Sequence, residues 1–259
     1  MRYHIDTIPL WDAIKLDGEC FLCAMSRKLE LGETERYLGA SVMEPDTRIQ
    51  VNDLGFCRRH HAMLYGMSNR LGHALMLESH MTRTRERMQK IMDSMAQSAD
   101  QLEKATLGKM SRTGSQAADE IRKQADALHS MASTCVLCNS IQENMDRYIQ
   151  TFFHLYKNDT EFREKFIHSK GVCLPHMADL AHAAPSSLSA KECAAFLRHL
   201  NQLEKENMDR MQEDISWFIR KFDYRFQNEP WKNSQDAVPR TVNKLRSWCV
   251  GDEPNPEES

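Results

Sequence analysis

The sequence has little glycine or proline and no long apolar run. Ten glycines and eight prolines in 259 residues are too few for many short strands joined by tight turns, so the composition favours helices. No segment approaches the roughly 18 consecutive apolar residues of a membrane-spanning helix. Residues 1–11 lack the apolar core of a signal peptide. We therefore expect a cytoplasmic protein with no membrane partner.

The sequence also lacks a large excess of charge of either sign. The net charge of -3 gives no reason to expect binding to nucleic acid. The chain is 41% apolar and 27% charged, which is typical of a folded globular protein. Phosphate loops, dinucleotide fingerprints and nucleophile elbows are absent from the sequence. This favours a protein that is not an enzyme, although a catalytic site assembled only in three dimensions stays open.

The cysteines, in contrast, are ordered. In a reducing compartment, we expect eight cysteines to serve as metal ligands or catalytic thiols rather than to form disulfides. Six of them form two copies of one pattern, in which a CxxC turn is followed much later by a CxxH turn. The first copy is Cys20, Cys23, Cys57 and His60, and the second is Cys135, Cys138, Cys173 and His176.

Two matching arrays in one chain predict an internal duplication. Gly55 and Gly171 stand two residues before the later cysteine of each copy, which suggests a close approach of the backbone to an ion. The predicted domains are a first metal-binding helical unit at 1–107, a flexible linker at 108–118, a second metal-binding helical unit at 119–228, and an irregular tail at 229–259 with a disordered end.

Long amphipathic helices surround the two arrays. Apolar and small residues recur in steps of three and four from Ala74 to Leu102, as in the seam of one long helix. Ser189 and Glu192 form a capping box before a second apolar run. The fold class predicted is all-α, with two tandem metal-centred helical units.

Zinc takes four Cys or His ligands in a tetrahedron, and each copy offers four. We expect each copy to bind its own ion, because loop-closure entropy grows only slowly with the length of the gap. When the two copies are aligned, His60 stands at the position of His176, so we expect His60 to be the ligand, with the adjacent His61 as the alternative. A filled set of four favours structural over catalytic zinc. An iron–sulfur cluster remains the competing cofactor, since three cysteines and one histidine can also hold one.

The function predicted is that of a non-enzymatic protein with two structural zinc ions, acting as a binding or adaptor module for an unknown protein partner. The alternative is a redox- or metal-responsive protein that uses an iron–sulfur cluster or reactive thiolates. Shielded ligand thiols should react slowly, so Cys249 near the tail should be alkylated first. The sequence does not fix the oligomeric state.

Several segments resemble an uncharacterised bacterial family, a domain of unknown function. The resemblance is carried by the start of the chain at 3–13, the first CxxC turn, the run from Gly171 to His176, the motif from Lys221 to Arg225, and Pro230-Trp231. It extends from Tyr3 to about Leu245. It implies a cytoplasmic protein with duplicated CxxC and CxxH motifs, and it supplies no activity.

Overall fold

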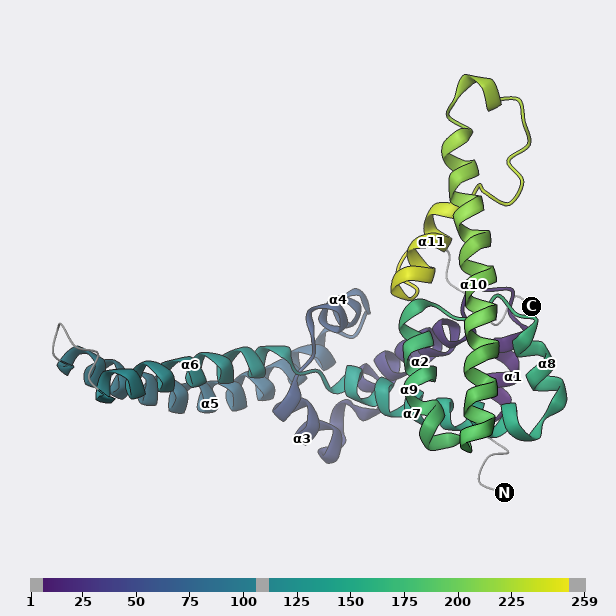
Figure 1. Cartoon of the computed structure of the whole chain (residues 1–259). Helices are drawn as coiled ribbons and strands as arrows, with labels where there is room; N and C mark the ends of the chain where they lie inside the picture. Colours follow the sequence, from purple (N-terminus) through teal and green to yellow (C-terminus); the bar gives the residue numbers. More distant parts are fainter. Residues whose placement is uncertain (1–6, 106–111, 252–259) are drawn as a thin grey trace. The chain divides into compact units, whose positions relative to one another are not determined.

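The computed structural model describes residues 7–105 and 112–251. Those residues form α-helices and two short 3-10 helices without any strand (Figure 1), which confirms the all-α fold. In chain order the elements are α1 (Thr7–Lys15), α2 (Phe21–Leu38), η1 (Ala40–Met43), α3 (Pro45–Leu54), α4 (Arg58–Gly66), α5 (Arg70–Lys104), α6 (Arg112–Ser133), α7 (Val136–Asn158), α8 (Thr160–Ile167), α9 (Leu174–Ser187), α10 (Ala190–Arg220), η2 (Tyr224–Phe226) and α11 (Ala237–Arg246). Across the described ranges, none of these helices has the length and apolarity needed to cross a membrane.

The chain divides into two compact units, and one is inserted into the sequence of the other. The terminal unit comprises Met1–Leu29 with Glu143–Ser259, and the inserted unit comprises Glu30–Gln142. The boundaries fall within α2 and α7, so this division differs from the predicted tandem units at 1–107 and 119–228. The internal duplication stays a prediction.

Two smaller predictions about irregular segments also change. Residues 112–118 of the predicted linker open α6, and residues 108–111 lie outside the described residues. The predicted irregular tail at 229–259 contains α11, while its end at 252–259 lies outside the described residues. The sequence between Ala237 and Arg246 places both apolar and basic residues at helical spacing, but Pro239 within it favours an irregular segment, and the structure accommodates this proline in the first turn of α11.

The core of the terminal unit is a cluster of aromatic rings from α7, α8 and α10. Phe152, Phe166 and Phe196 are fully buried. The ring of Phe152 meets that of Phe166 edge-on at 4.9 Å, and Phe153 meets Phe196 edge-on at 5.0 Å. Edge-to-face pairs at these separations add to the free energy gained by burial. The ring of Phe21, the first residue of α2, packs on Phe152 and Phe166, so the cluster also holds the start of the helix that carries Cys23.

The longest helix of the terminal unit, α10, begins where the capping box predicts. The Ser189 side chain accepts from the Glu192 N–H, and the Glu192 carboxylate accepts from the Ser189 N–H. At the other end of α10, a loop at 221–236 leads back toward α11 (Figure 1). The buried Lys221 ammonium organises that loop, because it donates to the backbone carbonyls of Phe226, Gln227 and Glu229.

The inserted unit has a separate apolar core. Its buried residues come from α2, α3, α4, α5 and the start of α7, and include Tyr37, Val51, Phe56, Leu64, Met76 and Val136. The predicted helical seam from Ala74 to Leu102 lies within α5. Beyond this core α5 pairs with α6, where Gln124 Nε2 donates to Ser94 Oγ at 2.7 Å and sets the register of the two helices.

Candidate metal centres

All eight predicted ligands lie in two tight groups, but the groups exchange partners between the two copies. The terminal centre consists of Cys20, Cys23, Cys173 and His176, and the inserted centre consists of Cys57, His60, Cys135 and Cys138. The prediction that each copy closes on itself is therefore wrong. The CxxC turn of one copy meets the CxxH turn of the other.

Helix length explains the exchange. The first CxxC turn leads directly into α2, which runs for 18 residues and therefore extends about 27 Å. The second leads into α7, which runs for 23 residues, about 35 Å. A flexible loop could return to the start of such a segment, but a rigid helix carries the chain away from it. Each CxxC turn is thus met by a segment distant in sequence.

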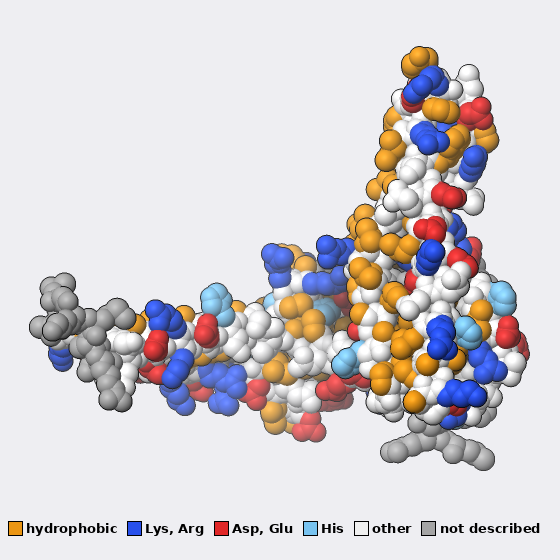
Figure 2. Space-filling view, in the orientation of Figure 1, with side chains coloured by type: hydrophobic (Ala, Val, Ile, Leu, Met, Phe, Trp, Pro, Cys, Tyr) orange, Lys and Arg blue, Asp and Glu red, His pale blue; other side chains and the backbone are white. Residues whose placement is uncertain are grey.

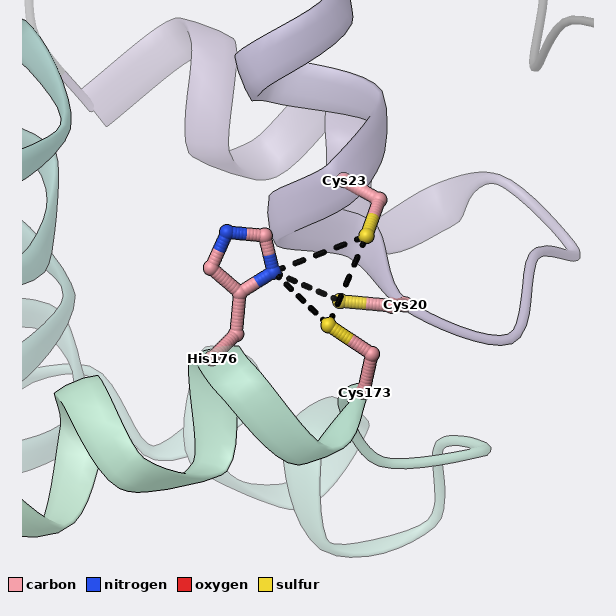
Figure 3. A group of neighbouring side chains, drawn as sticks. All are labelled: Cys20, Cys23, Cys173 and His176. Atoms are coloured by element: carbon pink, nitrogen blue, oxygen red, sulfur yellow. Dashed lines mark hydrogen bonds between the residues drawn. The ribbon is translucent and has the colours of Figure 1, made fainter. Parts of the chain in front are cut away.

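The terminal centre has the dimensions of a tetrahedral site (Figure 3). His176 Nδ1 lies 3.1 Å from Cys173 Sγ, 3.3 Å from Cys20 Sγ and 3.5 Å from Cys23 Sγ. Cys23 Sγ lies 3.6 Å from Cys173 Sγ. Around a tetrahedral zinc with bonds of about 2.3 Å to sulfur and about 2.0 Å to nitrogen, sulfurs lie about 3.8 Å apart and sulfur lies about 3.5 Å from nitrogen. The residues present therefore fit one zinc ion.

The inserted centre has similar spacing. His60 Nδ1 lies 3.2 Å from Cys135 Sγ, 3.3 Å from Cys57 Sγ and 3.4 Å from Cys138 Sγ. Cys57 Sγ lies 3.8 Å from Cys138 Sγ. His60 is the histidine that faces the sulfurs, whereas the neighbouring His61 directs its Nδ1 toward a different histidine.

Helix N-termini are directed at both centres. Cys57 and Cys173 are the N-cap residues of α4 and α9. Cys20 and Cys135 directly precede α2 and α7. The positive end of a helix dipole stabilises a nearby thiolate. A centre with three thiolates and one divalent ion carries a net negative charge. The two helix N-termini at each centre offset part of that charge.

The glycine before each CxxH turn is required by the backbone. Gly55 has φ +61° and Gly171 has φ +73°, a region that favours glycine. A Cβ on Gly55 would lie 2.5 Å from the His80 ring, and a Cβ on Gly171 would overlap the Glu204 carboxylate. These glycines therefore make room for side chains behind the turn, and not for the approach to the ion that the sequence suggested.

A carboxylate supports the histidine of the inserted centre. Glu30 Oε1 lies 3.2 Å from His60 Nε2, on the side of the ring away from the sulfurs. Arg59 donates to both oxygens of Glu30 at 2.6 and 2.7 Å. Such a carboxylate fixes the orientation of a ligating imidazole and raises its basicity. Burial lowers the pKa of His60, but its hydrogen bonds with Cys135 and Glu30 outweigh that effect and raise the pKa to about 10.

The thiols of the inserted centre are unequal in the metal-free chain. Burial raises the pKa of Cys135, but its hydrogen bond with His60 and backbone N–H groups lower it to about 6. Burial and the neighbouring Cys135 raise the pKa of Cys138 well above its ordinary value. At neutral pH the metal-free centre therefore pairs the Cys135 thiolate with the His60 imidazolium.

The segment after α11 covers the terminal centre. The Trp248 N–H donates to Cys23 Sγ at 3.3 Å, and Ser247 Oγ lies 3.2 Å from Cys173 Sγ. Hydrogen bonds of this kind damp the reactivity of metal-bound thiolates. No spacing in the sequence relates these two residues to a cysteine, because they follow α11, which lies far along the chain from both cysteines.

A buried ion pair holds the CxxH turn of the terminal centre. The Val172 N–H donates to Glu204 Oε1 at 2.6 Å, and Lys244 Nζ lies 2.9 Å from Glu204 Oε2. The same ammonium donates to the Lys170 carbonyl at 2.8 Å. Glu204 comes from α10 and Lys244 from α11, so the pair joins both helices to the residues just before Cys173.

Burial distinguishes the two centres. In the terminal centre Cys20, Cys23 and Cys173 are exposed by only 7%, 6% and 0%. In the inserted centre Cys138 is exposed and Cys57 is half-buried. Sequence alone predicts equivalent sites, and it carries no signal for this difference.

These observations define an all-helical protein with two groups of three cysteines and one histidine, each suited to hold a metal ion. The chain belongs to a family of unknown function, DUF6062, whose model matches residues 1–252. This confirms the resemblance to an uncharacterised family. A search of curated proteins and a search of solved structures returned no match.

Proposed function

We propose that this protein is a non-enzymatic zinc protein in which each of two structural ions holds one unit together, and that it acts as a binding or adaptor module. The observation that carries the proposal is the pair of complete four-ligand groups at tetrahedral spacing. Four protein ligands fill the coordination sphere of zinc and leave no position for water or substrate. The ion then supplies folding free energy rather than chemistry.

The spacing favours zinc over an iron–sulfur cluster. In a cluster the four ligands are divided among two or more iron atoms, so they surround a larger object than a single ion. The four ligand atoms of each centre lie within 4.8 Å of one another. That separation supports a single ion in each centre.

The state of the cysteines supports a cytoplasmic location. All eight lie among the described residues and carry free thiols. Thiolate ligands survive where the compartment keeps thiols reduced. We therefore place the protein in the cytoplasm as part of the proposal.

The loop at 221–236 supports the binding half of the proposal. Ile219, Phe222 and Tyr224 are exposed by 67%, 72% and 81%, and Figure 2 shows apolar and basic side chains gathered at this end of α10. The loop is held in place by Lys221 and by the Trp217 Nε1–H, which donates to the Pro230 carbonyl at 3.0 Å.

A pre-ordered loop with exposed aromatic rings is well suited to anchor a protein interface. Arg220 and Lys232 are also exposed, and Lys232 Nζ lies 4.1 Å from the centre of the Trp217 ring. We propose a partner protein with an apolar groove bordered by acidic side chains, which would complement both the rings and the basic residues.

Elemental analysis tests the proposal that the protein holds two structural zinc ions. Protein purified under reducing conditions without chelator should be colourless and contain about two zinc ions per chain. Removal of zinc by a chelator should lower helix content measured by circular dichroism, and added zinc should restore it. A brown protein with iron and acid-labile sulfide, or a protein without metal, overturns this half.

A variant of the loop at 221–236 tests the proposal that this loop binds a protein partner. The double substitution Phe222→Ser/Tyr224→Ser should leave the zinc content and the circular dichroism spectrum unchanged. A protein that copurifies with the wild-type chain should then bind the purified variant at least tenfold more weakly by calorimetry. Ile8→Ser removes an exposed apolar side chain of α1 in the same unit and should not change binding. Equal affinity of the loop variant and the wild type overturns the assignment.

A further inference from the structure

The second cysteines of the two CxxC turns occupy equivalent positions but differ in accessibility. Both Cys23 and Cys138 lie in the first turn of a helix, α2 or α7. Cys23 is buried and its sulfur accepts the Trp248 N–H. Cys138 is exposed, and its sulfur contacts Cys57 and His60 of its own centre.

We propose that Cys138 is a covalent modification site, at which electrophiles and peroxides attack the inserted centre and release its metal ion while the terminal centre keeps its own. This inference rests on the proposed function, because it presumes that both centres hold zinc. It names the residue where a structural site is chemically open, and for Cys138 alone it replaces the expectation that all ligand thiols react slowly.

Alkylation requires only an accessible sulfur. With iodoacetamide, the Cys138 sulfur attacks the methylene carbon, a carbon–sulfur bond forms and iodide leaves. The thioether that results is a neutral and much weaker ligand than a thiolate. Three ligands then remain on the ion, and the fourth position opens to water, which exposes the ion to exchange.

Oxidation by a peroxide follows the same route. The Cys138 sulfur attacks one peroxide oxygen, so an S–O bond forms, the O–O bond breaks, and the second oxygen leaves as water after taking a proton. The sulfur loses two electrons and becomes a sulfenic acid. The Cys57 thiolate, 3.8 Å away, then attacks this sulfur. A disulfide forms, the S–O bond breaks, and hydroxide takes a proton to leave as a second water.

The disulfide removes two of the four ligands at once. Cys135 and His60 remain, and two ligands hold zinc far less tightly than four. In the terminal centre the same reagents meet cysteine residues that are at most 7% exposed. The geometry thus predicts a stepwise loss in which one ion leaves well before the other.

The test uses the zinc-loaded full chain with Cys249→Ser, which removes the other exposed thiol. Modified cysteines are mapped by mass spectrometry over time in iodoacetamide, while a zinc indicator follows released metal. Cys138 should be modified at least ten times faster than Cys20, Cys23 or Cys173, with one zinc released per modified chain. One equivalent of hydrogen peroxide should release one zinc and link Cys57 to Cys138.

The control is Cys138→His, which keeps four ligands while removing the exposed sulfur. Its zinc should resist one equivalent of peroxide. The inference is overturned if Cys20 or Cys23 is modified first, if both ions leave together, or if Cys138 is modified without release of zinc. A chain that holds no zinc before treatment contradicts the proposed function instead, so the two failures are distinguishable.

Discussion

The sulfur of Cys23 lies 3.6 Å from that of Cys173, although 150 residues separate them in sequence. This contact requires that ligands from both copies share one ion. The double variant Cys23→Ser/Cys173→Ser should therefore lose one zinc and keep the other. Cys23→Ser/Cys57→Ser should lose both, because its two changes fall in different centres. Elemental analysis of the purified variants checks the pairing.

The opposite pattern would restore the pairing predicted from sequence. If Cys23→Ser/Cys57→Ser keeps one ion while Cys23→Ser/Cys173→Ser keeps none, each copy closes on itself. Circular dichroism on both variants distinguishes loss of an ion from loss of the whole fold.

Glu30 should tune the inserted centre without binding the ion. Glu30→Gln keeps the shape of the side chain but removes the carboxylate that faces His60 Nε2 at 3.2 Å. Loss of such a partner weakens metal binding by roughly 10–100-fold. Competition with a chromophoric chelator measures the affinity of the weaker centre. Glu35→Gln changes an exposed carboxylate of the same helix and should have no effect, so equal shifts in both variants would exclude this role for Glu30.

Removing one member of the buried ion pair Glu204–Lys244 should destabilise the protein more than removing both. Glu204→Leu leaves the ammonium without its counter-ion and should destabilise the terminal unit by about 3–5 kcal/mol. Adding Lys244→Met should restore all but about 1–3 kcal/mol, since the Val172 N–H then lacks its acceptor and the Lys170 carbonyl lacks the Lys244 donor. All four tryptophans lie in the terminal unit, so their fluorescence during urea unfolding reports on that unit. A double variant no more stable than the single one would contradict the argument.

Metal binding at the inserted centre should strengthen as the pH rises. The raised pKa of His60, about 10, means that it is protonated in the metal-free chain at neutral pH, and the raised pKa of Cys138 keeps that group a thiol. Binding one ion at pH 7–8 then displaces at least two protons, so the affinity should increase by about 100-fold per pH unit.

The same raised pKa has the opposite effect on the metal-free unit. Charged His60 stabilises that unit fully below its ordinary pKa of 6.5, and this contribution is lost as the pH rises through about 10. Affinity measured at pH 7 and pH 8 in the presence of a calibrated chelator checks the first effect. An affinity that is independent of pH over this range would show that both groups are already deprotonated.

The eight candidate ligands could be picked out from the sequence because their spacing is local, and the structure gathers all eight into two groups. A CxxC or CxxH turn at the start of a helix brings two ligands to one point whatever the rest of the chain does, and the register of the two copies separated His60 from His61. The apolar seam from Ala74 to Leu102 and the capping box at Ser189 are local signals of the same kind, and the structure has a helix at each, α5 and α10.

The pairing was not predictable, because it depends on where rigid helices lead. In the sequence, residues 24–56 are a gap whose closure costs little free energy if it is flexible, but in the structure most of them form α2 and α3. The supporting residues were missed for the same reason. Nothing in the sequence around Glu30, Glu204 or Lys244 relates them to a cysteine, and only packing of helices brings them there.

The insertion of one unit within the other sets an order of events during synthesis. Cys23 must wait for His176, which emerges 153 residues later, or about 8–30 s at the usual 5–20 residues per second. The inserted centre is complete once Cys138 has left the ribosome. Until Cys135 emerges, the cysteines of the nascent chain are Cys20, Cys23 and Cys57. With His60 they make four ligands that belong to two different centres. Helices form within microseconds, so formation of α2 before Cys57 emerges would separate the two turns and disfavour binding of one zinc ion by these four ligands.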